Sequence, residues 1–202
     1  LMKHIGLSLS VAILTVACSN GDDAQATGNA SAEQQTLSDI SPIDRKPFET
    51  TAIASFDEPW AMTFLPDGRM LVSEKAGQLQ LVDAKGQKTE IGGVPEVDYG
   101  GQGGFGDIVL APDFATSNMV YLSWVEAGEK DTRGAVVGRA RLELRGQKPA
   151  LKNLEIIWKQ NPKVTGRGHY SHRIAFSPDG EYLFIGSGER QKFDPAQDMA
   201  AN

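Results

Sequence analysis

The feature of this chain that most constrains its fold is a sequence pattern that recurs three times. Each copy has apolar residues four and two positions before a Pro-Asp pair, and a second apolar segment follows the pair. Apolar residues at every second position predict a half-buried strand, and Pro-Asp predicts a tight turn, so each copy is expected to form a β-hairpin. The copies begin at Trp60, Phe105 and His172, and their turn prolines are Pro66, Pro112 and Pro178.

The spacing of the repeats favours a β-propeller. The turn prolines lie 46 and then 66 residues apart, and a four-stranded propeller blade takes about 40–50 residues. A β-sandwich of hairpins is the alternative, but unrelated hairpins need not repeat their offsets so closely. We therefore predict an all-β fold of four-stranded antiparallel blades over residues 42–202. Three blades do not close a ring, so we expect an N-terminal fragment of a larger propeller.

Residues 1–18 have the pattern of an export signal. A short basic start precedes an apolar run from Ile5 to Ala17, which is too short to span a bilayer. Cys18 follows in the context LTVAC, which is typical of a bacterial lipobox, and it is the single cysteine of the chain. We expect a lipoprotein anchored at Cys18, with cleavage without lipid as the alternative. Both outcomes predict a periplasmic or cell-envelope protein whose only membrane contact is through the anchor.

Composition constrains the segment that follows and the class of partner. Residues 19–41 are small and polar, so they cannot bury enough apolar surface to fold and are expected to form a disordered linker. The chain has 20 basic and 26 acidic residues, a net charge of −6. This balance argues against nucleic acid as a partner.

The histidines suggest a site. Outside the signal-like segment the chain has two, His169 and His172. His169 lies nine positions before the turn proline of its repeat, and the same offset in the other repeats gives Asp57 and Gly103, beside Gln102. Equivalent positions of successive blades meet at one end of the central channel. We therefore predict that Asp57, Gln102 and His169 lie near a common axis, where propellers bind ligands.

The third hairpin adds a carboxylate to this site. If Phe176 pairs with Tyr182 across the turn, His169 faces Glu189. A carboxylate beside an imidazole orients the ring and fixes its tautomer, as in a general base. The competing interpretation is that His169 is a surface residue at the end of a strand. Strand alternation turns His172 to the opposite face from His169.

Other prominent side chains are expected to serve the structure. Trp60, Trp124 and Trp158 are assigned to the core or to packing between blades. Glu74 and Lys75 are expected in a solvated turn.

Residues from Glu58 to Asn202 resemble the soluble PQQ-dependent aldose sugar dehydrogenases, relatives of soluble quinoprotein glucose dehydrogenase with a six-bladed propeller. The matching segments are PWAMTFLPDGRMLVSEKAG, GGQGGFGDIVLAPDF, and HYSHRIAFSPDGEYLFIGSGER with a following AQD. Three motifs in order are more specific than any one of them. The likeness covers roughly the first half of a family member.

The resemblance assigns roles to three residues. His169 corresponds to the general base that takes the proton of the sugar's anomeric hydroxyl, and Glu189 to the acid that holds this histidine. Gln102 corresponds to a glutamine that helps to shape the quinone and sugar site. The Phe105–Gly106 pair replaces two leucines of the family. Gly168 replaces an aspartate of the glucose dehydrogenase branch, which favours the broad aldose branch.

The resemblance implies oxidation of an aldose at C1 to a lactone by hydride transfer to PQQ. It also implies a Ca²⁺ ion that polarises the quinone, and an external electron acceptor that reoxidises the cofactor. It places the calcium ligands, and the arginine and lysine that hold the PQQ carboxylates, after Asn202. We therefore expect no metal ligand in this chain, and no activity from it alone. Two alternatives stay open: a secreted propeller that binds a ligand or partner without redox chemistry, and a PQQ enzyme for sorbosone or another donor.

Overall fold

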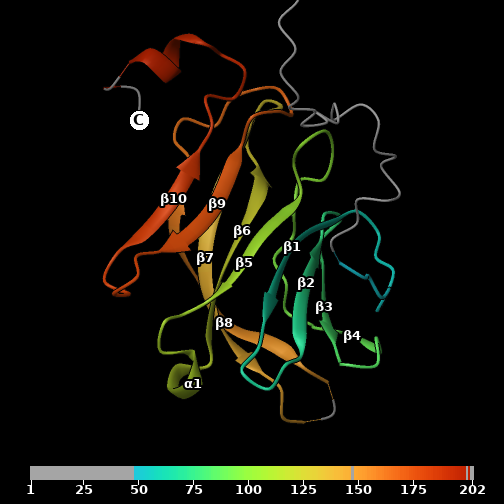
Figure 1. Cartoon of the computed structure of the whole chain (residues 1–202). Coiled ribbons are helices and arrows are strands. Elements are labelled where there is room, and N and C mark those ends of the chain that lie inside the picture. Colours follow the sequence, from blue (N-terminus) through green and yellow to red (C-terminus); the bar gives the residue numbers. More distant parts are fainter. Residues whose placement is uncertain (1–47, 147, 199, 201–202) are drawn as a thin grey trace, which may run out of the picture. The chain divides into compact units, whose positions relative to one another are not determined.

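The computed structural model describes residues 48–146, 148–198 and 200 (Figure 1). The chain divides into two parts, Leu1–Glu49 and Thr50–Asn202, and the strands of the described residues belong to the second. The predicted signal peptide with Cys18, the linker 19–41 and the first residues of the predicted propeller domain lie outside the described residues. In the described part of the chain, no helix has the length and apolar character needed to cross a membrane.

Strands dominate the described residues, in agreement with the all-β prediction. They are accompanied by one short α-helix and by a 3-10 helix at Asp194–Gln197. The elements are β1 (Pro59–Phe64), β2 (Met70–Glu74), β3 (Gln78–Val82), β4 (Lys88–Glu90), β5 (Phe105–Leu110), α1 (Phe114–Ser117), β6 (Met119–Ala127), β7 (Arg133–Glu143), β8 (Ala150–Lys159), β9 (Ser171–Phe176) and β10 (Leu183–Ser187).

The strands form two sheets and one hairpin, all antiparallel, and these three strand units follow the three sequence repeats (Figure 1). Sheet 1 contains β1–β4 and sheet 2 contains β5–β8, each in chain order, while β9 and β10 form hairpin 3. The prediction of four-stranded antiparallel units is therefore confirmed for the first two repeats. The third repeat supplies two strands among the described residues, and closure into a ring stays a prediction.

The Pro-Asp turns form for the predicted reason. In the first turn the Gly68 amide donates to the Leu65 carbonyl at 2.9 Å, and in the third the Gly180 amide donates to the Ser177 carbonyl at 2.8 Å. Both glycines have positive φ, +86° and +76°, which a side chain disfavours. In the second turn α1 intervenes, and Asn118 in the left-handed conformation ends it before β6.

The register of hairpin 3 differs from the predicted one. Phe176 pairs with Leu183 rather than with Tyr182, so that prediction is wrong by one residue. An irregularity further along the hairpin restores the predicted offset, and Ser171 pairs with Ser187. One extra residue in one strand is enough to make such a shift. The segments beyond the ends of the two strands therefore meet in the predicted register.

The main hydrophobic core lies between sheet 1 and sheet 2. Sheet 1 contributes Leu71 and Leu79, and sheet 2 contributes Phe105, Leu122 and Trp124, all of them buried. Burial of a side chain of this size contributes roughly 1.5–3 kcal/mol relative to exposure. This core holds the inner strands β1 and β5 against each other.

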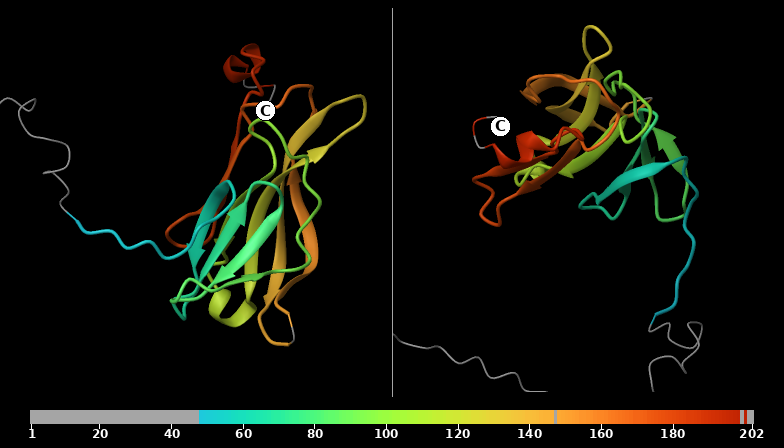
Figure 2. Two further views of the ribbon diagram at one scale, coloured as in Figure 1. Left: turned by 90° about the vertical axis from the view of Figure 1, so that its right-hand side faces the viewer. Right: turned by 90° about the horizontal axis from the view of Figure 1, so that it is seen from above.

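Hairpin 3 packs on the other face of sheet 2. Tyr170, just before β9, joins Val125 and Ala135 of sheet 2 in a second buried cluster, against which Trp158 is partly buried. Tyr121 and Phe176 make an edge-to-face contact with ring centroids 5.0 Å apart. The inner strands therefore lie in the order β1, β5, β9, as Figure 2 shows.

His172 connects all three units at their inner strands. Its ring stacks on Trp60 of β1, with centroids 5.0 Å apart and an interplanar angle of 18°. Its Nδ1 lies 2.9 Å from the Ser123 hydroxyl of β6. It also covers Gly106 of β5 so closely that a Cβ there would overlap the imidazole. The packing role expected for Trp60 is confirmed. The imidazole of His172 fills the space that a side chain at position 106 would occupy.

The buried imidazole predicts a pH-dependent stability. Burial, reinforced by the positive charge of Arg173, lowers the pKa of His172 to about 4, whereas an unfolded histidine titrates near 6.5. Between these values the unfolded chain binds the proton more readily, so the unfolding free energy falls as pH is lowered from 6.5 to 4. The unfolding free energy should fall by about 3 kcal/mol over this range. None of this loss has occurred above pH 6.5, and it is complete below pH 4.

Urea unfolding of the full-length protein at pH 7, 5.5 and 4 measures this loss. The His172→Gln variant lacks the titrating group, and it should show a smaller fall in unfolding free energy across the same range. An identical fall in both proteins would assign the pH dependence to other groups and contradict the prediction.

Candidate active site

Three segments meet at one end of the inner strands. They are the glycine-rich loop 98–104 before β5, the loop 160–170 before β9, and residues 188–193 after β10. The Gln102 amide donates to the Arg167 carbonyl at 2.8 Å, and the Arg190 amide donates to the His169 carbonyl at 3.2 Å. The structure therefore brings together all three residues to which the resemblance assigns a role.

Gln102 contacts His169 directly. The side-chain oxygen of Gln102 accepts a hydrogen bond of 2.7 Å from the His169 backbone amide. Because the amide oxygen is used in this way, the side-chain nitrogen of Gln102 remains as a donor.

The His169 ring is paired with Glu189. Nδ1 hydrogen-bonds one carboxylate oxygen of Glu189, and the other oxygen accepts the backbone amides of Lys192 at 2.5 Å and Phe193 at 2.8 Å. The hydrogen bond from the Phe193 amide, followed by that from His169, lowers the pKa of Glu189 to about 2. Glu189 is thus a carboxylate at neutral pH and can only accept, so the proton of this hydrogen bond lies on Nδ1 of His169.

This tautomer leaves Nε2 of His169 with a lone pair. The His169 side chain is 50% exposed, whereas the Glu189 side chain is 18% exposed. Glu189 is thus the more buried partner, and no hydrogen bond among the described residues uses Nε2. An unprotonated Nε2 held by a carboxylate on Nδ1 is the arrangement of a general base.

The backbone around the ring is strained. His169, Ser171 and His172 all have positive φ, of +49°, +61° and +44°. A residue with a side chain pays a conformational cost in this region, and such residues persist only where surrounding contacts hold them. In this conformation the Tyr170 side chain is buried in the core, while the neighbouring His169 side chain is half exposed.

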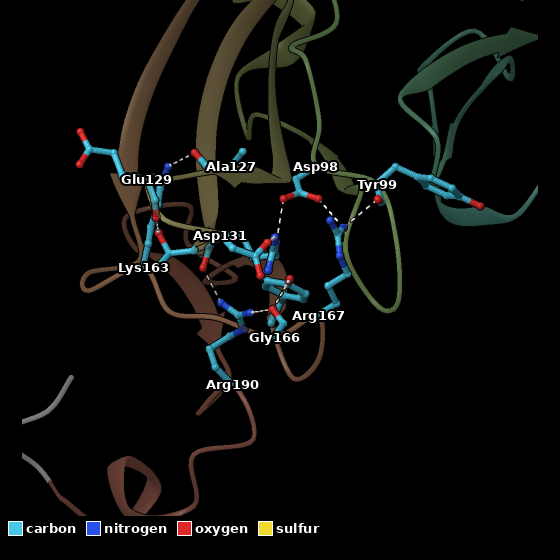
Figure 3. Close-up of polar contacts among 12 residues, drawn as sticks. Asp98, Tyr99, Ala127, Glu129, Asp131, Lys163, Gly166, Arg167 and Arg190 are labelled. Carbon is cyan, nitrogen blue, oxygen red and sulfur yellow. Dashed lines mark hydrogen bonds and ion pairs between the residues drawn. The ribbon is translucent and has the colours of Figure 1, made fainter.

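A charged frame made of Asp98, Arg133 and Arg167 joins the loops that carry Gln102 and His169, and Figure 3 shows Asp98 beside Arg167. Asp98 accepts a hydrogen bond of 2.8 Å from Nε of Arg133 and forms an ion pair with Arg167. Arg167 also donates to the Tyr99 carbonyl at 2.9 Å. Burial opposes ionisation of Asp98, but the hydrogen bonds from the two arginines outweigh it and lower its pKa. The frame therefore ties the Gln102 loop to the His169 loop.

Asp57 and Glu74 contact each other. The Asp57 amide donates to the Glu74 carboxylate at 2.8 Å, so Asp57 lies against the end of β2, and its approach to a common axis with Gln102 and His169 stays a prediction. The prediction of a solvated Glu74 is wrong: it is 3% exposed and also accepts a hydrogen bond of 2.9 Å from Gln80.

Sequence reasoning missed the charged frame. Asp98, Arg133 and Arg167 stand in loops or at strand ends without a pattern that marks them. Sequence reasoning also missed Arg190, which is buried behind the His169 loop. The one sequence signal for a role of Arg190 in the site is that it directly follows Glu189. Its buried position depends on the packing of hairpin 3 against sheet 2, which no local pattern encodes.

Comparison with known proteins places the chain among sugar dehydrogenases. The family described as Glucose / Sorbosone dehydrogenase matches residues 56–202. Aldose sugar dehydrogenase YliI of Escherichia coli (strain K12) is 40% identical over 145 residues, which cover 71% of this chain and 38% of that protein. The chain thus spans well under half the length of this relative.

Solved structures agree with the sequence matches. The apo-form of the soluble aldose sugar dehydrogenase of Escherichia coli matches with a TM-score of 0.65 and 40% identity, covering 70% of this chain and 41% of that one. The PQQ-bound aldose sugar dehydrogenase of Streptomyces coelicolor matches with a TM-score of 0.64 and 33% identity, covering 73% and 43%. On these grounds the chain belongs to the glucose/sorbosone dehydrogenase family.

Proposed function

We propose that this chain is the N-terminal part of a PQQ-dependent aldose sugar dehydrogenase, which oxidises aldoses at C1 to lactones. The observation that carries the proposal is the exposed His169 ring, held by the ionised Glu189 and placed beside Gln102. Family membership supports the class of reaction, and a relative has been solved with PQQ bound.

The surface of the described residues supports a longer propeller. Met62 and Phe64 of β1 are 55% and 59% exposed, and Tyr182 and Phe184 at β10 are 63% and 60% exposed. These apolar side chains lie on the first and third units, at the two ends of the row of inner strands. Further blades would cover both groups, which removes apolar surface from water.

His169 is the proposed general base. Its Nε2 accepts the proton of the anomeric hydroxyl of the aldose, while Glu189 stabilises the positive ring through Nδ1. Gln102 fixes the backbone at His169 through its side-chain oxygen and offers its side-chain nitrogen to an oxygen of the bound ligand. Proton removal from the hydroxyl raises the electron density at C1, which favours departure of the hydride.

The residues present fit one part of PQQ. The open Nε2 and the amide of Gln102 suit the polar ring of a quinone, which accepts the hydride when it is bound. The carboxylates of PQQ need cations, but the nearby Lys75 and Arg167 are paired with Glu58 and Asp98. His169 and Gln102 would therefore contact the quinone and the sugar, and the carboxylates would be held by residues of later blades.

The described residues do not fit Ca²⁺. Within residues 48–146, 148–198 and 200, no three His, Cys, Asp or Glu side chains gather as a metal site. Calcium takes six to eight oxygen ligands. We therefore assign no step of the reaction in this part of the chain to a metal.

Reconstitution of the full-length protein tests the proposed function. Apo-protein titrated with PQQ in the presence of Ca²⁺ should reduce an artificial electron acceptor when an aldose is added, and the rate should saturate with PQQ. A polyol of the same length without an anomeric hydroxyl is the matched control and should give no turnover. Bound PQQ without aldose oxidation would contradict the proposal. Faster oxidation of sorbosone than of any aldose would contradict the proposed substrate and favour the sorbosone alternative.

A further inference from the structure

We propose that Arg190 is the positioning residue of this site, which fixes the backbone before His169 so that the ring meets Glu189. The inference rests on the proposed function, because it gives Arg190 a role through His169. Arg190 itself is 2% exposed and cannot touch a substrate.

The guanidinium of Arg190 binds three carbonyl oxygens, two in the loop before β9 and one on β7. It donates to the Gly168 carbonyl at 2.8 Å, to the Gly166 carbonyl at 2.6 Å, and to the Arg133 carbonyl of β7 at 2.7 Å. Figure 3 shows the side chain of Arg190 directed at Gly166. Its own backbone amide bonds the His169 carbonyl. One residue thus holds the loop on both sides of the His169 amide.

No carboxylate among the described residues forms an ion pair with Arg190. Burial lowers its pKa, and the ring of Tyr170 lies 3.7 Å from the guanidinium carbon. A buried cation is costly unless its donors are satisfied. Here the donors are satisfied almost entirely by main-chain carbonyls, so the side chain fixes backbone rather than neutralising a charge.

The loop before His169 needs such a restraint. Residues 166–168 read Gly-Arg-Gly, and Gly166 has φ +96°. Glycine loses more conformational freedom on ordering than any other residue. The five donors of a guanidinium lie in one plane and can bind several carbonyls at once, which the point charge of lysine cannot reproduce. Because Arg190 follows Glu189, it fixes both partners of the pair from one position.

Substitution and chemical rescue test the role in the full-length protein loaded with PQQ and Ca²⁺. Arg190→Ala is expected to lower kcat by about 10²-fold, the effect of misplacing a reacting group by about 1 Å, while KM changes little. Guanidinium ion added to this variant should restore part of kcat, and Arg190→Lys should be intermediate. Leu79→Ala, a cavity in the core of sheet 1, is the control for lost stability and should keep kcat in its folded fraction.

A readout independent of activity separates the two proposals. The proton on Nδ1 of His169, observed by NMR in protein labelled with ¹⁵N-histidine, should be protected by Glu189 in the wild type and in Leu79→Ala. In Arg190→Ala or Arg190→Lys this resonance should broaden or disappear, and guanidinium should restore it in the alanine variant.

An unchanged Nδ1–H resonance in both Arg190 variants would overturn the positioning role, whether or not the protein oxidises sugars. An equal loss of kcat in Leu79→Ala, or no rescue by guanidinium in a folded Arg190→Ala, would contradict the positioning role. Arg190 would then only stabilise the fold. Loss of the resonance in an enzyme that shows no aldose oxidation would support the positioning role and reject the proposed reaction.

Discussion

Replacing His169 with alanine is expected to lower kcat by about 10²–10⁴-fold, the usual contribution of a general base, in the full-length protein reconstituted with PQQ and Ca²⁺. This corresponds to roughly 3–5 kcal/mol of activation free energy. The side chain is half exposed, so its removal leaves no cavity in the core. The unfolding free energy should therefore change little, and kcat at saturating PQQ and aldose is the measurement.

The control for His169→Ala must lie close to His169 in the chain without contacting the His169–Glu189 pair. Sequence alternation suggests His172 for this purpose, but His172 is buried against Trp60 and Ser123, and its removal would destabilise the fold. Ser171→Ala is the better control, because Ser171 is exposed. Comparable losses in His169→Ala and Ser171→Ala would show that the loop, not the base, was affected.

Glu189→Gln is expected to be more damaging than Glu189→Ala. The Lys192 and Phe193 amides require an oxygen acceptor, so glutamine must place its oxygen there and its NH₂ against the His169 ring. Nδ1 must then accept, and the proton moves to Nε2, where the base needs a lone pair. A wrong tautomer of this kind reduces kcat by up to about 10⁴-fold.

Alanine at position 189 forces neither tautomer, because water can replace the carboxylate. The loss of kcat for Glu189→Ala should therefore be smaller than that for Glu189→Gln, although the glutamine is closer in shape to glutamate. Glu181→Gln, an exposed carboxylate in the β9–β10 turn, is the matched control and should retain wild-type kcat. A glutamine variant more active than the alanine variant would contradict the tautomer argument.

Local patterns in the sequence predict the hairpins and much of the site. The Pro-Asp turns specify where each strand reverses, since proline presets φ and Gly68 and Gly180 accept positive φ. The meeting of His169 with Glu189 follows from counting residues across the third turn. These features depend on residues close in sequence or paired across one turn.

Features that depend on packing between the three units could not be predicted. The irregularity in hairpin 3 shifts the pairing of Phe176 by one residue without leaving a mark in the sequence. His172 and Glu74 look like solvent-exposed polar residues until neighbouring strands cover them. Arg190 is buried because the loop carbonyls of Gly166 and Gly168 converge on it, which is a property of the folded chain alone.

The central claim is that Nε2 of His169 faces the reacting hydroxyl. A crystal structure of the full-length protein with PQQ and a bound aldose tests it most directly. We predict the anomeric oxygen of the sugar within about 2.6–3.2 Å of Nε2, with Nδ1 still bonded to Glu189 and the quinone beside Gln102. A sugar bound with its anomeric oxygen out of reach of His169, or with another side chain at that oxygen, would contradict the account.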